Sequence, residues 1–145
     1  MTTPGRQLFR FEATLEAVAR TTAALGPLLP ARLPESDRQA VELGLAEALS
    51  NIVRHGHAGR STQAVEVEWQ ETGRALRIEI RDAGLPIPAA ELNRDGPSVF
   101  DFDVTDLGRL PEGGMGLELI RGAFDRLDYV SRDGVNRLRL VKFFP

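Results

Sequence analysis

The sequence predicts an α+β fold, a two-layer sandwich in which helices pack on one face of a mixed, mostly antiparallel sheet. Two observations predict this class. Apolar residues recur at helical spacing in two early segments, and alternating apolar and polar residues form two hairpin patterns further along the chain. A chain of 145 residues suits one domain, residues 1–145, and no internal repeat divides the sequence.

The first third of the chain predicts one strand and two helices. Residues 7–11 predict a short strand, and the alanine-rich stretch 14–29 predicts a helix that ends before a proline. Ser36 or Asp37 is expected to cap a second helix, which ends near Gly56. This second helix has an apolar stripe at helical spacing, formed by Val41, Leu45, Ala48, Leu49 and Ile52.

Two hairpins complete the predicted sheet. Residues 65–69 alternate apolar and polar, a Thr72-Gly73 turn follows, and residues 76–80 alternate again, so this hairpin has one buried face. Between 83 and 114 the pattern dissolves into Pro, Gly and Asp, and a connection of that length is expected to be functional or mobile. The chain then predicts a helix over 115–124, a strand over 127–130, an Asp133-Gly134 turn and a strand over 138–141.

Composition excludes several classes of function. Apolar residues make up 42% and charged residues 27%, which is ordinary for a soluble globular protein. The net charge of −3 offers no general attraction to nucleic acid or anionic lipid. There is no cysteine for a disulfide or a Cys-based zinc site, and neither a signal peptide nor a transmembrane run is visible. We expect a cytoplasmic protein that contacts no nucleic acid directly and no membrane.

The first polar cluster lies on the second predicted helix. At about 100° per residue, Glu47, Asn51 and His55 fall on successive turns, roughly 6 Å apart along the axis. They lie beside the apolar stripe, so three polar groups are directed toward one edge of the core. Spacing alone also fits a solvated helix face whose carboxylate, amide and imidazole have no special relation.

The second cluster, Asp82-Ala83-Gly84, ends the first hairpin. An Asp that leaves a strand can cap the next turn, and the Gly can supply a positive φ, so a purely structural interpretation is available. The functional interpretation is that the carboxylate accepts a hydrogen bond from an exocyclic amino group while the glycine allows a flat ring to approach. An adenine would fit such a site.

The third cluster, Gly113-Gly114-Met115-Gly116-Leu117, opens the helix after the long connection. Glycines before a helix leave its first N–H groups free, and the positive end of the helix dipole favours an anion such as phosphate. A hinge or a tight helix–sheet contact explains the same glycines. The motif is neither a Walker A loop nor a Rossmann fingerprint, because GK[ST] and an early GxGxxG turn are both missing.

The order and separation of these clusters resemble the ATP-binding motifs of the GHKL superfamily, whose fold is the Bergerat fold. Residues 47–55 are similar to its N box, Asp82-Ala83-Gly84 to its G1 box, and residues 113–117 to its G2 box. In so short a chain, the resemblance is to the anti-sigma-factor serine kinases. It extends from the first strand to the last and includes 116–121 and 136–138.

The resemblance implies roles for the helical cluster. Asn51 matches the N-box magnesium ligand, and an amide oxygen is a suitable hard donor for Mg²⁺. Glu47 matches the residue that orients or deprotonates the nucleophile, and it lies one turn from Asn51. His55 takes the final N-box position, although it could equally cap the end of the helix. Neither His55 nor His57 is expected to act as a nucleophile, and His57 is expected to be an exposed loop residue.

The resemblance also implies how ATP is held. Asp82 reads the adenine amino group, Gly84 makes room for the ring, and residues 93–113 form an ATP lid. Arg109 lies near the position of a lid arginine that contacts the terminal phosphate. Members of the superfamily often have a hydroxyl residue in the last strand that supports the Asp, but 138–142 contains none, which predicts weaker adenine affinity. The phosphates are expected at the backbone amides of the glycine-rich motif, Gly113, Gly114, Met115, Gly116 and Leu117.

The implied function is that of an ATP-dependent serine/threonine protein kinase, an anti-sigma-factor-like regulator that uses ATP and Mg²⁺. Its protein substrate would be an anti-sigma-factor antagonist. The alternative is a non-catalytic or weakly catalytic ATP-binding module that sequesters a sigma factor or another regulatory partner, since binding and phosphotransfer share nearly all of these residues. Glu47 favours catalysis. Homodimers are common among these kinases, and the sequence leaves the oligomeric state open.

Overall fold

The computed structural model describes residues 6–57, 60–87 and 114–145, and their side chains except those of residues 60–62 and 114–117. Within this part of the chain, five strands form one sheet in the order β1-β2-β3-β5-β4, and every neighbouring pair is antiparallel. The predicted α+β class is confirmed, and the described sheet is antiparallel throughout. The strands are β1 (Arg6–Thr14), β2 (Arg60–Glu71), β3 (Ala75–Asp82), β4 (Arg126–Arg132) and β5 (Val135–Phe143).

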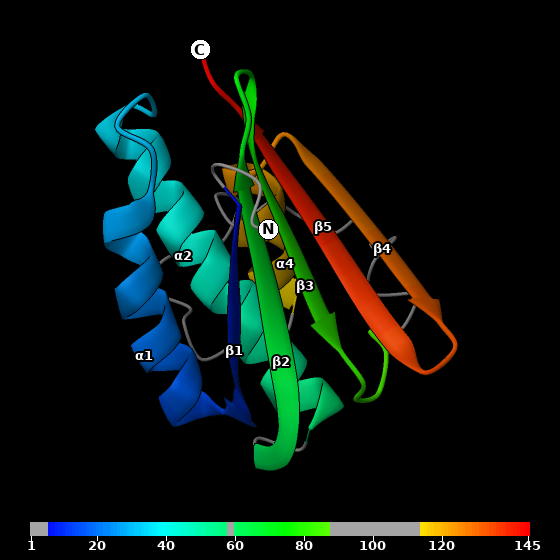
Figure 1. Cartoon of the computed structure of the whole chain (residues 1–145). Coiled ribbons are helices and arrows are strands. Elements are labelled where there is room, and N and C mark those ends of the chain that lie inside the picture. Colours follow the sequence, from blue (N-terminus) through cyan, green and yellow to red (C-terminus); the bar gives the residue numbers. More distant parts are fainter. Residues whose placement is uncertain (1–5, 58–59, 88–113) are drawn as a thin grey trace, which may run out of the picture.

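The helices cover one face of this sheet (Figure 1). They are α1 (Leu15–Leu25), η1 (Gly26–Leu28), α2 (Glu35–Asn51), η2 (Ile52–Gly56) and α4 (Gly114–Ala123). The first predicted helix is shorter than expected and continues as the 3₁₀ turn η1, because Pro27 has no N–H to extend the α-helical ladder. The predicted N-cap of the second helix is wrong. Pro34 takes the N-cap position without a side-chain bond, and its carbonyl accepts from the Arg38 N–H (3.0 Å).

Both predicted hairpins are present, and their turns explain their registers. Thr72 N–H donates to the carbonyl of Ala75 (2.9 Å) and closes the β2–β3 turn. The β4–β5 turn has Asp133 at φ 54° and Gly134 at φ 77°, the left-handed pair that Asp-Gly favours in a tight hairpin. In the resulting register, Asp82 at the end of β3 lies opposite Asn136 near the start of β5.

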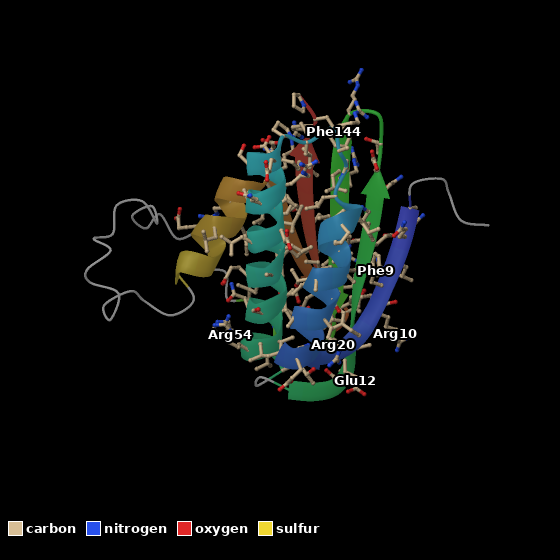
Figure 2. All side chains as sticks on the ribbon, turned by 90° about the vertical axis from the view of Figure 1, so that its left-hand side faces the viewer. Phe9, Arg10, Glu12, Arg20, Arg54 and Phe144 are labelled. Carbon is tan, nitrogen blue, oxygen red and sulfur yellow. The ribbon has the colours of Figure 1, made fainter. Side chains whose placement is uncertain are left out.

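The core lies between the two layers. Figure 2, seen from the side of α1 and β1, shows side chains filling the space between helices and sheet, whereas Arg54 at the end of the helical layer points away from the sheet. Gly44 lets α2 approach α4, because a Cβ there would lie 2.8 Å from the Cβ of Ala123. Each fully buried aliphatic side chain contributes roughly 1.5–3 kcal/mol. The largest such side chains are Leu25, Leu33, Leu45, Leu49, Leu76, Ile78, Ile80, Ile120 and Leu140.

The opposite face of the sheet is polar and carries ion pairs, both within a strand and between strands. Arg81 contacts Glu68 (3.1 Å) and Glu79 (2.8 Å), and Arg139 also reaches Glu79 (3.2 Å). Exposed pairs of this kind stabilise a fold by only about 0–1 kcal/mol each. Their main effect is to make this face compatible with water, which leaves the polar groups at the end of β3 as the unusual ones.

Candidate nucleotide site

The C-terminal end of α2 and the end of β3 meet at one edge of the molecule. The N–H of Leu85 donates to the carbonyl of Gly56 (3.1 Å), which ties the segment after β3 to the end of the helix. Between Asn51 and this contact, η2 is a π-helical turn, whose bonds span five residues instead of four. The wider turn directs the residues after it toward the end of β3.

Asp82 is the centre of this junction. It is a buried carboxylate, 6% exposed, and its Oδ2 accepts three hydrogen bonds. The donors are the N–H of Gly84 (2.9 Å), His57 Nε2 (3.0 Å) and Asn136 Nδ2 (3.3 Å). A buried carboxylate is costly unless hydrogen bonds and opposite charges offset the loss of water. Three donors on one oxygen supply that compensation and fix the orientation of the group.

The position of His57 corrects the sequence-based prediction of an exposed loop residue. Its side chain is only 1% exposed, and its Nε2 lies 3.0 Å from Asp82 Oδ2. Because the acceptor is a carboxylate oxygen, Nε2 is the donor in this contact. The prediction was wrong because it treated residues after the helix as a free loop, whereas η2 turns the chain back onto the end of β3.

Asn136 is a site residue that the sequence analysis missed. Its amide donates to Asp82 Oδ2 and to the carbonyl of Gly84 (2.9 Å), and its own Oδ1 accepts from the hydroxyl of Ser131 (2.7 Å). The last strand, β5, has no hydroxyl residue, as the sequence analysis stated for 138–142. An amide near the start of β5 and a hydroxyl on β4 support Asp82 instead. No buried side-chain nitrogen or oxygen of the described residues lacks a partner.

Gly84 is required by close packing and not by an unusual backbone conformation. A Cβ at this position would lie 2.4 Å from the carbonyl oxygen of Gly56 and 2.6 Å from His57 Nε2. The positive φ angles of the described residues belong to Asp133 and Gly134, so the turn explanation of Gly84 does not apply. The glycine makes room for the protein's own helix end beside Asp82.

Tyr129 borders the same junction from β4. Its hydroxyl accepts a hydrogen bond from the N–H of Ile87 (2.9 Å). Burial raises the pKa of this phenol above its ordinary value of 10.0, the bond from Ile87 lowers it, and the negative charge of Asp82 raises it. The phenol thus stays neutral at physiological pH and acts as an acceptor that holds the segment after Gly84.

The predicted helical cluster is only partly regular. Glu47 and Asn51 lie one α-helical turn apart near the end of α2, the first half-buried and the second 6% exposed. His55 lies on the π-helical turn η2, and its side chain is exposed. The expectation of three equivalent successive turns therefore holds for Glu47 and Asn51, whereas the wider turn sets His55 apart.

The remaining predicted residues are described in part. Arg109, Gly113 and the segment 93–113 lie outside the described residues. The helix predicted after the glycine pair is confirmed as α4, which begins at Gly114 and includes Met115, Gly116 and Leu117. Because these are the first residues of a helix, their backbone N–H groups lack intrahelical partners. That geometry suits a phosphate.

A metal would rely on few protein ligands. Among the described residues, no three His, Cys, Asp or Glu side chains are grouped so that they could hold an ion. Asn51 can offer an amide oxygen, which fits Mg²⁺, an ion that usually keeps water and takes substrate phosphate oxygens. In the part of the chain that the structure describes, no helix is both long and apolar enough to cross a membrane.

The fold and this junction define a class. A helix-covered antiparallel sheet with a buried carboxylate at a strand end, beside the polar end of a helix, is the arrangement of a GHKL-type ATPase domain. The chain belongs to the histidine kinase-like ATPase domain family, whose sequence profile matches residues 11–142. Membership of an ATPase-domain family implies that the chain binds ATP.

Solved structures share this fold. One of them is the crystal structure of the RsbU and RsbW domains of Rv1364c from Mycobacterium tuberculosis, similar with a TM-score of 0.58 and 16% sequence identity. The match covers 97% of this chain and 33% of that one, so this chain spans about a third of the other's length. Among proteins with curated descriptions, none is similar enough in sequence to match.

Proposed function

We propose that the chain is an ATP-dependent serine/threonine protein kinase, an anti-sigma-factor-like regulator that phosphorylates an anti-sigma-factor antagonist protein. The observation that carries the proposal is the buried, three-fold bonded carboxylate of Asp82, next to the helix end that bears Glu47 and Asn51. Two likenesses support the regulatory role. The motifs resemble those of anti-sigma-factor serine kinases, and the name of the similar solved structure includes an RsbW domain.

The adenine would be recognised at Asp82. Its carboxylate accepts a hydrogen bond from the exocyclic amino group, while Asn136 and the N–H of Gly84 hold it in place. A charged acceptor strengthens such a bond relative to a neutral one. This assigns the deepest part of the site to the base and directs the phosphates toward α2 and the start of α4.

The phosphates would be held by α4, the lid and the metal. The free N–H groups of residues 114–117 face an anion at the start of α4, and Arg109 in the lid segment 93–113 would contact the terminal phosphate. Asn51 would hold Mg²⁺ through its amide oxygen, and the ion would supply positive charge that offsets the negative charge developing on the phosphates during transfer.

Glu47 would be the general base. It takes the proton from a Ser or Thr hydroxyl of the protein substrate, and the hydroxyl oxygen then forms a bond to the γ-phosphorus. The bond from that phosphorus to the bridging oxygen breaks, and ADP leaves with the electron pair. Glu47 suits this role because it is only half-buried, so a substrate hydroxyl can reach it, and it lies one turn from Asn51.

The direct test is phosphotransfer from labelled ATP to an antagonist-like protein encoded beside this chain. Glu47→Gln keeps size and helix preference but removes the base, so transfer should slow at least roughly a hundredfold while ATP·Mg²⁺ affinity stays near the parental value. Glu42→Gln, an exposed glutamate on the same helix, is the matched control and should keep the parental rate. Asn51→Ala should lose the part of ATP binding that depends on Mg²⁺.

Two results would redirect the proposal. If Glu47→Gln transfers phosphate as fast as Glu42→Gln, Glu47 is not the base. If the parent chain binds ATP and its protein partner but transfers nothing to any Ser or Thr, the sequestering module becomes the better description, with a sigma factor or another regulator as its target.

A further inference from the structure

His57 is the one buried imidazole of the described residues, and the roles assigned so far do not use it. It comes directly after η2, and the packing around it is close enough that Gly84 cannot carry a side chain. Its side chain is 1% exposed, and its Nε2 lies 3.0 Å from Asp82 Oδ2. A donor held this closely to a carboxylate limits which further donors that carboxylate can accept.

The described donors to Asp82 all bond the same one of its two carboxylate oxygens. Gly84 N–H, His57 Nε2 and Asn136 Nδ2 all bond Oδ2, at 2.9, 3.0 and 3.3 Å. All three bonds use the same oxygen, so they fix the orientation of the carboxylate, and the proposed adenine bond is assigned to Oδ1.

We propose that His57 is a positioning and specificity-determining residue, which fills Asp82 Oδ2 so that the site accepts adenine and rejects guanine. The inference rests on the proposed placement of the base at Asp82. Adenine presents one amino group at its C6 position, and a single carboxylate oxygen satisfies it. Guanine has an oxygen at C6, which a carboxylate repels, and its neighbouring N1–H and amino donors match a carboxylate only when both oxygens are free.

In this mechanism, His57 lowers the affinity for guanine more than it raises the affinity for adenine. Without its donor, Oδ2 keeps the N–H of Gly84 and the longer bond from Asn136, so the carboxylate is held less firmly. A guanine edge could then pair through both oxygens by displacing the longer bond from Asn136, while the adenine bond would lose its fixed acceptor. The difference in affinity between two bases is large when the wrong base leaves a buried polar group without a partner.

The test compares ATP and GTP affinities of the full chain by calorimetry with Mg²⁺. In His57→Leu, GTP affinity should rise and ATP affinity should fall by at most about threefold, so that the ATP-to-GTP preference narrows by at least about tenfold. His57→Gln places an amide donor near the position of Nε2 and should keep the preference within about threefold of the parent. Leu25→Ala, a core substitution at the far end of α1, controls for general destabilisation and should leave the preference unchanged.

The outcomes separate this inference from the proposed function. If the parent binds neither nucleotide, the proposed function fails before any variant is compared. If the parent prefers ATP and His57→Leu keeps the full preference, His57 has only a structural role and the inference is overturned. Should His57→Leu not fold, His57→Asn decides the matter. Its shorter side chain does not reach Oδ2, so a preference equal to that of His57→Gln would overturn the inference, and a reduced one would support it.

Discussion

The two ends of β3 differ in how their polar groups are satisfied. At the start of the strand, Thr72 Oγ1 bonds the N–H of Arg74 (3.2 Å) and of Ala75 (3.0 Å), so its partners lie two and three residues away. At the other end, Asp82 bonds His57 and Asn136, which are 25 and 54 residues away in sequence. The first set builds a surface turn, and a turn of that kind forms locally.

The difference indicates which polar groups need a functional explanation. A turn at the surface loses little when its hydrogen bonds exchange with water. A buried carboxylate held by donors from three separate segments is expensive to assemble, and an apolar packing of the same volume is often equally stable. We therefore expect a ligand at the Asp82 end of β3, called the long-range end because its hydrogen bonds join residues far apart in the sequence. The following predictions compare the two ends.

The largest expected effect on stability comes from the glycines at the two ends. Gly84→Ala would place a Cβ 2.4 Å from the carbonyl oxygen of Gly56, so backbone must move, and we expect a loss of about 1–3 kcal/mol with weaker ATP binding. A Cβ in Gly73→Ala meets no atom within 4 Å, so the free energy of unfolding should stay within about 0.5 kcal/mol of the parental value. Urea unfolding of both variants measures these free energies. Equal losses at both positions would mean that the Gly56–Gly84 contact is not formed.

A smaller effect is expected from Tyr129 at alkaline pH. Its folded pKa is raised above 10.0, so its contribution to stability is fully present below about pH 10 and is lost as the pH rises through the folded pKa. The parent should lose more stability than Tyr129→Phe between about pH 8 and about pH 11. Since this is the only tyrosine of the sequence, phenolate absorbance reports its ionisation alone, and a midpoint equal to that in urea would contradict the predicted burial.

Elements with a local signal were predictable from the sequence. The two hairpins, the stripe of α2 and the glycine pair before α4 follow from alternation, helical spacing and turn residues that lie close together in the chain. The resemblance of residues 47–55, 82–84 and 113–117 likewise rests on short motifs, and the coarser part of it, membership of the histidine kinase-like ATPase domain family, is confirmed.

The partners of Asp82 were not predictable in the same way. Asn136 reaches it only because β3 and β5 pair in one register, and a single residue's slip would turn its side chain to the other face. His57 reaches it only because α2 ends in a π-helical turn, which residue spacing at 100° per residue does not anticipate. Both misses arise from tertiary geometry, and both concern polar side chains that alone give no sign of burial.

The central claim, that the long-range end of β3 binds ATP, is tested most directly by calorimetric titration of ATP·Mg²⁺ into the parent, Asp82→Asn and Thr72→Ala. Asp82→Asn replaces a charged acceptor and presents a wrong donor to the adenine amino group, so it should lose on the order of 1–3 kcal/mol of ATP affinity. Thr72→Ala removes bonds at the other end and should bind ATP as the parent does. Parental ATP affinity in Asp82→Asn, or no ATP binding by the parent, would contradict the claim.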